Sequence, residues 1–152
     1  MMASFTESTH PSDGNQIIDE NFAVEQKSLG NECFINGNHG QAIIYYTNAL
    51  QRSVHHKVIL YTNRSAAYLG LGDYTNALND ADAAITLDTS WLKAYYRKAS
   101  VYETMGRLDQ VYLTWKSALE HCETHPTLTK QYMSIEKRWK KCIRSKEYPI
   151  QR

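Results

Sequence analysis

Residues 70–74 of this chain read GLGDY, a glycine-containing turn between two stretches whose apolar residues recur with helical spacing. Comparable turns, NGNHG at 36–40 and TMGRL at 104–108, lie on either side of it. One glycine of each turn keeps a fixed spacing: Gly37, Gly72 and Gly106 are separated by 35 and 34 residues. A fixed period of this length is the signature of a repeat architecture. The sequence therefore predicts three units, each with two helices of about 14 residues joined by a turn.

Small residues recur with the same period at two further positions of the unit. One column holds Gly30, Ser65 and Ala99, and another holds Ala49, Ala84 and Ala118. Small residues let two helices approach closely, so we expect both columns to mark contacts between helices. Gly30 needs such a reason, because a glycine inside a helix costs about 1 kcal/mol relative to alanine. We expect Gly30 to lie against the second helix of its unit, near Ala42 and Ala49.

These three units resemble the tetratricopeptide repeat, a helix–turn–helix unit, over residues 20–122. The resemblance implies an all-α fold in which three repeats and a C-terminal capping helix form a right-handed superhelix, or α-solenoid. It predicts a disordered N-terminal tail at 1–18, repeats at 19–56, 57–90 and 91–124, a capping helix at 125–147 and a tail at 148–152. Two units depart from the family pattern, because Val54 and Thr89 stand where a unit usually ends in proline.

The segment that begins at Pro126, PTLTKQYMSIEKRWKKCIRSK, is amphipathic. Its apolar face carries Leu128, Tyr132, Ile135, Trp139 and Cys142, and its basic face carries Lys137, Arg138, Lys140, Lys141 and Arg144. The open end of a repeat stack needs a cover with a polar outer face, so we expect this helix to pack on the last repeat. A basic helix is also typical of proteins that bind anionic lipid or nucleic acid, but packing already accounts for the apolar face, and the pI of about 7.7 is far from that of a nucleic-acid binder. We therefore favour the capping role and expect no nucleic-acid partner, while the role of the basic face stays open.

Composition limits the class of protein. The 152 residues are 42% hydrophobic and 22% charged, which is ordinary for one soluble globular domain. Cys33, Cys122 and Cys142 are odd in number and far apart, which favours reduced thiols in a cytosolic or nuclear compartment, and we expect a cytoplasmic location. The N-terminal residues lack the pattern of a secretion signal, and no run of eighteen apolar residues predicts a membrane span.

Lysine, arginine and asparagine residues lie on the first predicted helix of the three units. Lys27 and Asn31 are four residues apart and share a helix face, as do Lys93 and Arg97, and the middle unit offers Asn63. In the tetratricopeptide family the first helices line the concave surface. The set resembles the carboxylate clamp of co-chaperones, since Lys27 precedes the Gly30–Asn31 pair, Asn63 begins NRSAAY, and Lys93 and Arg97 lie in KAYYRK.

The resemblance implies a non-enzymatic adaptor without a cofactor. Its ligand would be the C-terminal Glu-Glu-Val-Asp tail of heat-shock protein 90 or heat-shock protein 70, with Phe34 slightly favouring the former. Lysine and amide donors suit the carboxylates of such a tail, and family positions matched by Phe34, Ala66 and Leu69 form an apolar peptide pocket. We expect the clamp side chains to face solvent in the empty groove.

Two other readings are compatible with the repeats. HCETH at 121–125, with His55 and His56 elsewhere, contains possible metal ligands, but it lacks a second half at metal spacing. A structural scaffold that joins a complex through its convex face or its basic helix would explain the repeats but would leave the five clamp residues without a role. The chain is also compatible with being part of a longer protein.

Overall fold

The structure is a computed structural model that describes residues 18–123 and 125–145. These residues form seven α-helices and no strand: α1 (Glu20–Ile35), α2 (His39–Arg52), α3 (Lys57–Gly70), α4 (Tyr74–Leu87), α5 (Leu92–Thr104), α6 (Leu108–His121) and α7 (Pro126–Ser145). The predicted tails, except for Ile18, and residues 146–147 of the predicted capping helix lie outside the described residues.

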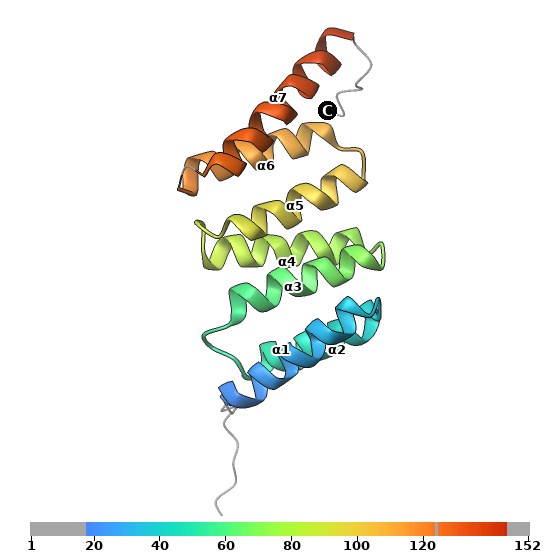
Figure 1. The fold of residues 1–152 in the computed structure, drawn as a ribbon, viewed down its shortest axis with the longest axis vertical. Coiled ribbons are helices and arrows are strands. Elements are labelled where there is room, and N and C mark those ends of the chain that lie inside the picture. The colour runs from blue at the N-terminus through green and yellow to red at the C-terminus, as the bar shows by residue number, and fades with distance from the viewer. Residues whose placement is uncertain (1–17, 124, 146–152) are drawn as a thin grey trace, which may run out of the picture.

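The helices stack one upon another along the long axis of the molecule (Figure 1). α1 packs against α2, α3 against α4 and α5 against α6, and contacts between consecutive pairs join them into one stack. α3 also contacts both α1 and α5, so the first helices of the three pairs lie side by side. The predicted all-α solenoid of three helix pairs and a seventh helix is confirmed.

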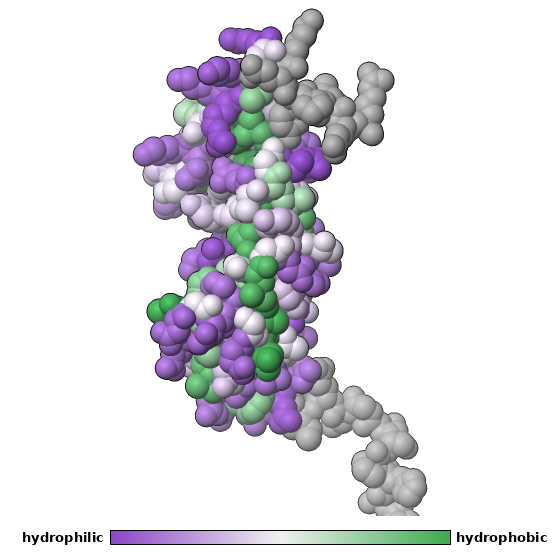
Figure 2. Space-filling view, turned by 90° about the vertical axis from the view of Figure 1, so that its right-hand side faces the viewer, coloured by the Kyte–Doolittle hydropathy of each residue, from purple (hydrophilic) through white to green (hydrophobic). Residues whose placement is uncertain are grey.

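Each pair turns back on itself at a glycine with a left-handed backbone. The φ angles are 77° at Gly37, 75° at Gly72 and 71° at Gly106. Residues with a Cβ atom rarely adopt such angles, which explains why the glycine column has the clearest period in the sequence. Figure 2 looks onto the side of the molecule where these turns lie and shows a vertical band of apolar side chains. The exposed apolar residues beside the turns are Ile35, Leu71 and Met105.

Alanines fill the contacts between helices, and larger residues fill the spaces around them. Ala42, Ala49, Ala77, Ala84 and Ala118 are all fully buried. One core cluster joins α1, α2 and α3 around Tyr46 and Leu60, and another joins α5, α6 and α7 around Tyr95 and Trp115. Each cluster lies between neighbouring helices, as expected when every repeat packs only on the next.

α7 covers the end of the third pair with the apolar face that the sequence predicts. Leu128 and Ile135 are buried in the same core cluster as residues of α5 and α6. The ring centroids of Tyr132 and Trp139 lie 5.8 and 6.2 Å from that of Tyr112 on α6. The packing of α7 therefore accounts for its apolar stripe.

Gly30 lies where α1 approaches α2 closely, as expected, but its neighbour differs from the expectation. The nearest side chain is Tyr46, not Ala42 or Ala49, and a Cβ atom added to Gly30 would lie 2.6 Å from Cε1 of that ring. Tyr46 is only 1% exposed. The glycine is therefore needed to admit a buried aromatic ring to the surface of α1.

This contact predicts opposite effects for two glycine-to-alanine substitutions in neighbouring helices. Gly30→Ala should lower the free energy of unfolding by about 1–3 kcal/mol, because overpacking outweighs the gain in helix propensity. Gly40→Ala should raise it by up to about 1 kcal/mol, because α2 has open space at Gly40 and only propensity changes. Urea denaturation followed by circular dichroism measures both. If both substitutions stabilise the protein, the Tyr46 ring moves away from the new methyl group at little energetic cost.

The start of α1 is tied to the loop between α2 and α3. The carboxylate of Glu20 accepts hydrogen bonds from the backbone N–H groups of Val54 and His55 and from the Ser53 hydroxyl, and it pairs with His56. The bond from the Val54 N–H is the main cause that lowers the pKa of Glu20 to about 2. The Asp19 N–H also donates to the Arg52 carbonyl at 3.0 Å. These bonds fix α1, which carries Lys27 and Asn31, relative to α3.

Candidate functional site

The first helices of the three pairs, together with α2, surround a hollow of about 260 Å³. It is lined by Asn31, Phe34 and Ile35 of α1, Tyr46 of α2, Asn63 and Ala66 of α3, and Arg97 of α5. Three of the five residues predicted for the clamp and two of the three predicted for the apolar pocket meet here. The repeat stack thus brings together residues that are more than 60 positions apart in sequence.

The other predicted residues lie around this hollow or away from it. Lys27 is half-buried one helical turn before Asn31, and Lys93 is exposed one turn before Arg97. Each lysine therefore shares a helix face with a residue of the hollow. The Lys93 Nζ atom lies 5.7 Å from the centroid of the Trp91 ring. Leu69 is half-buried and does not line the hollow.

Ile35 takes part in the apolar wall, and the sequence analysis missed it. Its side chain lines the hollow although the residue is 81% exposed. Helical periodicity assigns it to the surface, and only the position of the last turn of α1 beside α3 gives it a place in the site. The apolar wall is therefore formed by Phe34, Ile35 and Ala66.

Asn31 is held in place by two hydrogen bonds, so the expectation that the clamp residues all face solvent is wrong. The Tyr46 hydroxyl donates to Asn31 Oδ1 at 2.8 Å, and Asn63 Nδ2 donates to the same oxygen at 3.1 Å. Lys93 alone among the five is exposed; the others are half-buried. The physical reason for Asn31 is that Asn63 of α3 and Tyr46 of α2 both donate to its oxygen, which draws its side chain into the contact between these helices.

Tyr46 is the second residue of the site that sequence reasoning missed. The sequence pattern predicts that a tyrosine in the second helix of a unit lies in the hydrophobic core, and the Tyr46 ring does lie there. Burial raises the pKa of Tyr46 to about 12, while the nearby charge of Arg97 opposes this change. The hydroxyl therefore remains protonated at physiological pH. The repeat column offered no clear signal, because Trp115 takes the same place in the third unit, where the facing column holds Ala99.

The electrostatic character of the hollow favours an anion. Arg97 makes no hydrogen bond or ion pair with any other described residue, and no carboxylate is found among the described residues that line the hollow. Asn31 Nδ2 likewise has no acceptor within the described ranges. The hollow thus offers unused donors beside an apolar wall. A carboxylate with an aliphatic neighbour matches both parts.

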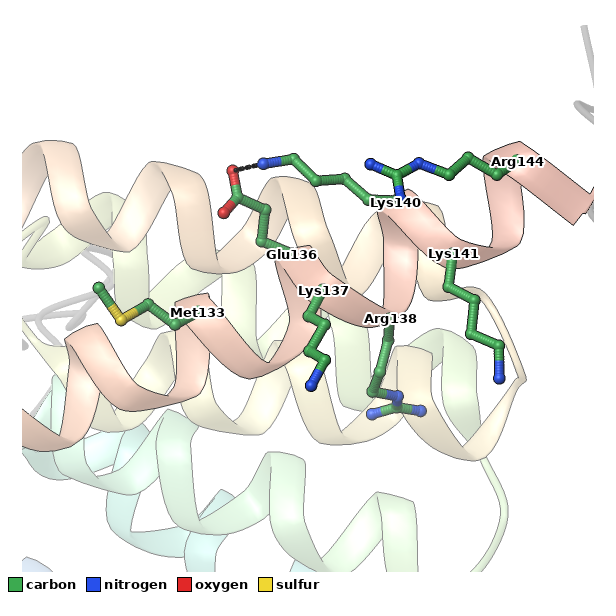
Figure 3. A pocket seen from close by; sticks show the side chains of 7 residues that line it. All are labelled: Met133, Glu136, Lys137, Arg138, Lys140, Lys141 and Arg144. Atoms are coloured by element: carbon green, nitrogen blue, oxygen red, sulfur yellow. Dashed lines mark ion pairs between the residues drawn. The ribbon is translucent and has the colours of Figure 1, made fainter.

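A larger hollow of about 530 Å³ runs along α7 (Figure 3). All of its described lining residues belong to that one helix: Met133, Glu136, Lys137, Arg138, Lys140, Lys141 and Arg144. Lys140 pairs with Glu136 at 3.0 Å, and Arg138 pairs with Glu103 of α5 at 3.3 Å. Figure 3 shows these side chains spreading to different sides of the helix rather than converging on one point. The smaller hollow, where several helices converge, is the better candidate.

The described residues also bear on the metal-binding and membrane alternatives. Within residues 18–123 and 125–145, no group of three or more His, Cys, Asp or Glu side chains gathers as it would around a metal ion. Cys122, which belongs to the HCETH segment, packs against the core cluster of α5, α6 and α7. No helix in the described ranges has the length and apolar character needed to cross a membrane.

Comparison with known proteins identifies the repeats. A model of the tetratricopeptide repeat family matches residues 58–90 and 92–110. The fold is similar to the first TPR of Spaghetti (RPAP3) bound to the HSP90 peptide SRMEEVD, with a TM-score of 0.69 and 26% identity over 83% of this chain and 98% of that one. This chain contains tetratricopeptide repeats. The domain is also similar to the second TPR domain of human RPAP3 in complex with the HSP70 peptide SGPTIEEVD, with a TM-score of 0.64 and 27% identity over 76% of this chain and 96% of that one.

Two longer proteins contain segments that are similar to this chain. The domain is 37% identical to heat shock protein STI1 of Saccharomyces cerevisiae over 98 residues, which are 64% of this chain and 17% of the yeast protein. It is 42% identical to protein unc-45 homolog B of Xenopus tropicalis over 91 residues, which are 59% of this chain and 10% of that protein. The chain therefore spans less than a fifth of the length of either relative.

Proposed function

We propose that this domain is a non-enzymatic adaptor that binds the C-terminal Glu-Glu-Val-Asp tail of heat-shock protein 90 or heat-shock protein 70. The observation that carries the proposal is the make-up of the hollow: two amides, an arginine without an ion pair in the described ranges, and an apolar wall. A carboxylate bound there meets donors and no repelling charge on the described lining residues. A cytoplasmic location follows from this choice of partner.

Each part of the ligand has a chemically suitable place. We assign the two carboxylates of the terminal aspartate to Lys27, Asn31 and Asn63. The preceding acidic residues then lie near Lys93, which acts as a point charge, and Arg97, which binds in a forked manner. The hollow is smaller than the roughly 300–1,000 Å³ of typical small-molecule sites, so the end of an extended peptide suits it better than a compact ligand.

The apolar wall gives the valine of the tail, or a residue upstream of it, a place to pack. Phe34, Ile35 and Ala66 line this part of the hollow. The peptides bound by the two solved relatives, SRMEEVD and SGPTIEEVD, share their last four residues and differ before them. This supports a clamp that reads the common ending, while the upstream contacts decide between the two chaperones.

A peptide ending in Met-Glu-Glu-Val-Asp should bind with a micromolar Kd, about −8 kcal/mol. Amidation of its C-terminus should weaken binding by about tenfold or more, because a hydrogen bond to a charged group contributes about 1.5–3 kcal/mol. Isothermal titration calorimetry of the free and the amidated peptide tests this. Equal affinity for both would rule out a carboxylate clamp and favour the scaffold function. Raising the salt concentration provides a second check, since it should weaken binding of the free peptide.

The basic face of α7 provides the control for non-specific attraction. Changing Lys140 and Lys141 together to alanine should alter the affinity for the peptide by less than about 0.5 kcal/mol, because both side chains are exposed and do not line the clamp hollow. The same calorimetric titration measures this. A large loss of affinity would instead place the acidic peptide on α7.

A further inference from the structure

We propose that Tyr46 is a positioning residue of this site, whose hydroxyl turns the Asn31 amide so that its N–H donors face the bound carboxylate. The proposal rests on the proposed function for the nature of the ligand. It concerns a residue of the second helix of its repeat, which lines the hollow but is not one of the five predicted clamp residues. Tyr46 acts on the peptide through Asn31.

The fit between α1 and α2 places the Tyr46 hydroxyl beside Asn31. Because Gly30 has no side chain, the Tyr46 ring lies against α1, where a Cβ atom would approach Cε1 to 2.6 Å and Cζ to 3.1 Å. The hydroxyl then extends to the next residue, Asn31, at 2.8 Å. The Gly30–Asn31 pair therefore forms two halves of one contact: the glycine admits the ring, and the asparagine accepts its hydroxyl.

The polarity of the Asn31 side chain decides which ligand it can bind. An asparagine amide has one oxygen that accepts and one nitrogen that donates, and the two ends have similar size. Only the nitrogen end attracts a carboxylate. Tyr46 and Asn63 both donate to Oδ1, which occupies the oxygen and leaves Nδ2 for the ligand. Without the hydroxyl, one of the two bonds that distinguish the ends is lost.

Tyr46 can donate its hydrogen bond to Asn31 over a wide pH range. The residue is buried, and burial raises the pKa of its hydroxyl to about 12. The group therefore remains a donor at every pH at which the domain is expected to work. Phenylalanine at this position keeps the ring against Gly30 and removes only the hydroxyl, so Tyr46→Phe isolates the hydrogen bond.

The binding experiment uses calorimetry with the Met-Glu-Glu-Val-Asp peptide, free and amidated. The Tyr46→Phe variant should bind the free peptide about fivefold more weakly than the parent, because it loses one hydrogen bond of ordinary strength. The amidated peptide should respond less, because its end offers a weaker acceptor. In an Asn31→Ala background, Tyr46→Phe should have no further effect on affinity, since the group that it positions is gone.

Tyr95→Phe is the matched control for a merely structural role. Tyr95 is 3% exposed, lies on the helix that carries Lys93 and Arg97, and donates its hydroxyl to the Thr89 carbonyl at 3.0 Å. Both phenylalanine variants lose one buried hydrogen bond, so both should melt a few degrees below the parent. Only Tyr46→Phe should weaken binding of the peptide. Equal affinities in the parent and in Tyr46→Phe would overturn the proposal.

A second measurement does not depend on the peptide. NMR relaxation of the Asn31 side-chain amide in the free domain should show an ordered group in the parent and greater motion in Tyr46→Phe, with no such change in Tyr95→Phe. An amide that is equally ordered in the parent and in Tyr46→Phe would refute the positioning role even if the parent binds no peptide. Failure of the parent to bind, with the amide loosened by Tyr46→Phe, would instead overturn the proposed function alone.

Discussion

Replacing Arg64 with alanine should lower the free energy of unfolding by about 3–5 kcal/mol, because it leaves a buried carboxylate without its partner. Arg64 of α3 forms a forked ion pair with Asp80 of α4, through Nε at 2.7 Å and Nη2 at 2.8 Å. The side chains are only 17% and 7% exposed. Although burial by itself disfavours the charged guanidinium, the hydrogen bonds and charge of Asp80 raise the pKa of Arg64 overall.

The same arginine also joins the first helix pair to the second. Its Nη1 donates to the Thr47 hydroxyl of α2 at 2.9 Å, and its guanidinium lies 5.6 and 5.7 Å from the ring centroids of Tyr61 and Tyr68. Arg64→Ala therefore removes a contact between repeats as well as an ion pair. Hydrogen exchange should become faster in α3 and α4, and chemical denaturation gives the loss in free energy.

A second ion pair of α4 supplies a matched control. Lys98 of α5 pairs with Asp82 at 2.7 Å, but these side chains are 26% and 53% exposed. Lys98→Ala should cost no more than about 1 kcal/mol, since surface pairs are screened by solvent. Similar losses for Lys98→Ala and Arg64→Ala would show that the Arg64–Asp80 pair is effectively solvated and that its burial does not determine stability.

Replacing Arg97 with alanine should weaken binding of the free-acid peptide by about 2–5 kcal/mol while leaving the melting temperature nearly unchanged. Arg97 lines the hollow and is half-buried, so the ligand completes its desolvation. It has no hydrogen-bond or ion-pair partner in the described part of the chain. Its removal therefore leaves no other polar group of that part without a partner. Calorimetry and thermal denaturation of the same preparation measure the two effects.

Arg144→Ala removes the same side chain from α7, where it is exposed. Both variants change the net charge equally, so a long-range attraction would treat them alike. We expect Arg144→Ala to bind the peptide as the parent does. If Arg97→Ala also binds at full strength with an unchanged melting temperature, the clamp is lost as an explanation and the scaffold function takes its place.

Asn31→Ala provides a less clean test than Arg97→Ala, for a reason visible only in the structure. Removing the Asn31 amide would leave the buried Tyr46 hydroxyl without its acceptor, which costs about 1–3 kcal/mol of stability. A loss of binding by Asn31→Ala would therefore mix a missing ligand contact with a loosened first repeat. The sequence alone predicted that Asn31 faces solvent in the empty groove, and a variant of such a residue would fold as well as the parent.

The period of the three turn glycines was sufficient to predict the helix pairs, because Gly37, Gly72 and Gly106 occupy a backbone conformation that other residues rarely adopt. The apolar spacing of α7 was likewise sufficient to predict which face packs on the last repeat, since burial requires a continuous stripe on one side of a helix. Both features are local. They depend on backbone sterics and helical periodicity, which act over a few neighbouring residues.

The details of the site depend on contacts between helices that are distant in sequence. Spacing placed Asn31, Asn63 and Arg97 on the first helices of the repeats, but it could not show that Tyr46 holds Asn31 or that Ile35, rather than Leu69, lines the hollow. The sequence by itself determined on which helix face Asn31, Asn63 and Arg97 lie, because the helical and repeat periods fix that face, while the expectation that these faces line a groove came from the resemblance to the repeat family. The tertiary structure alone decided which atoms remain free to bind a ligand, because hydrogen bonds between side chains depend on distances set by how the helices pack.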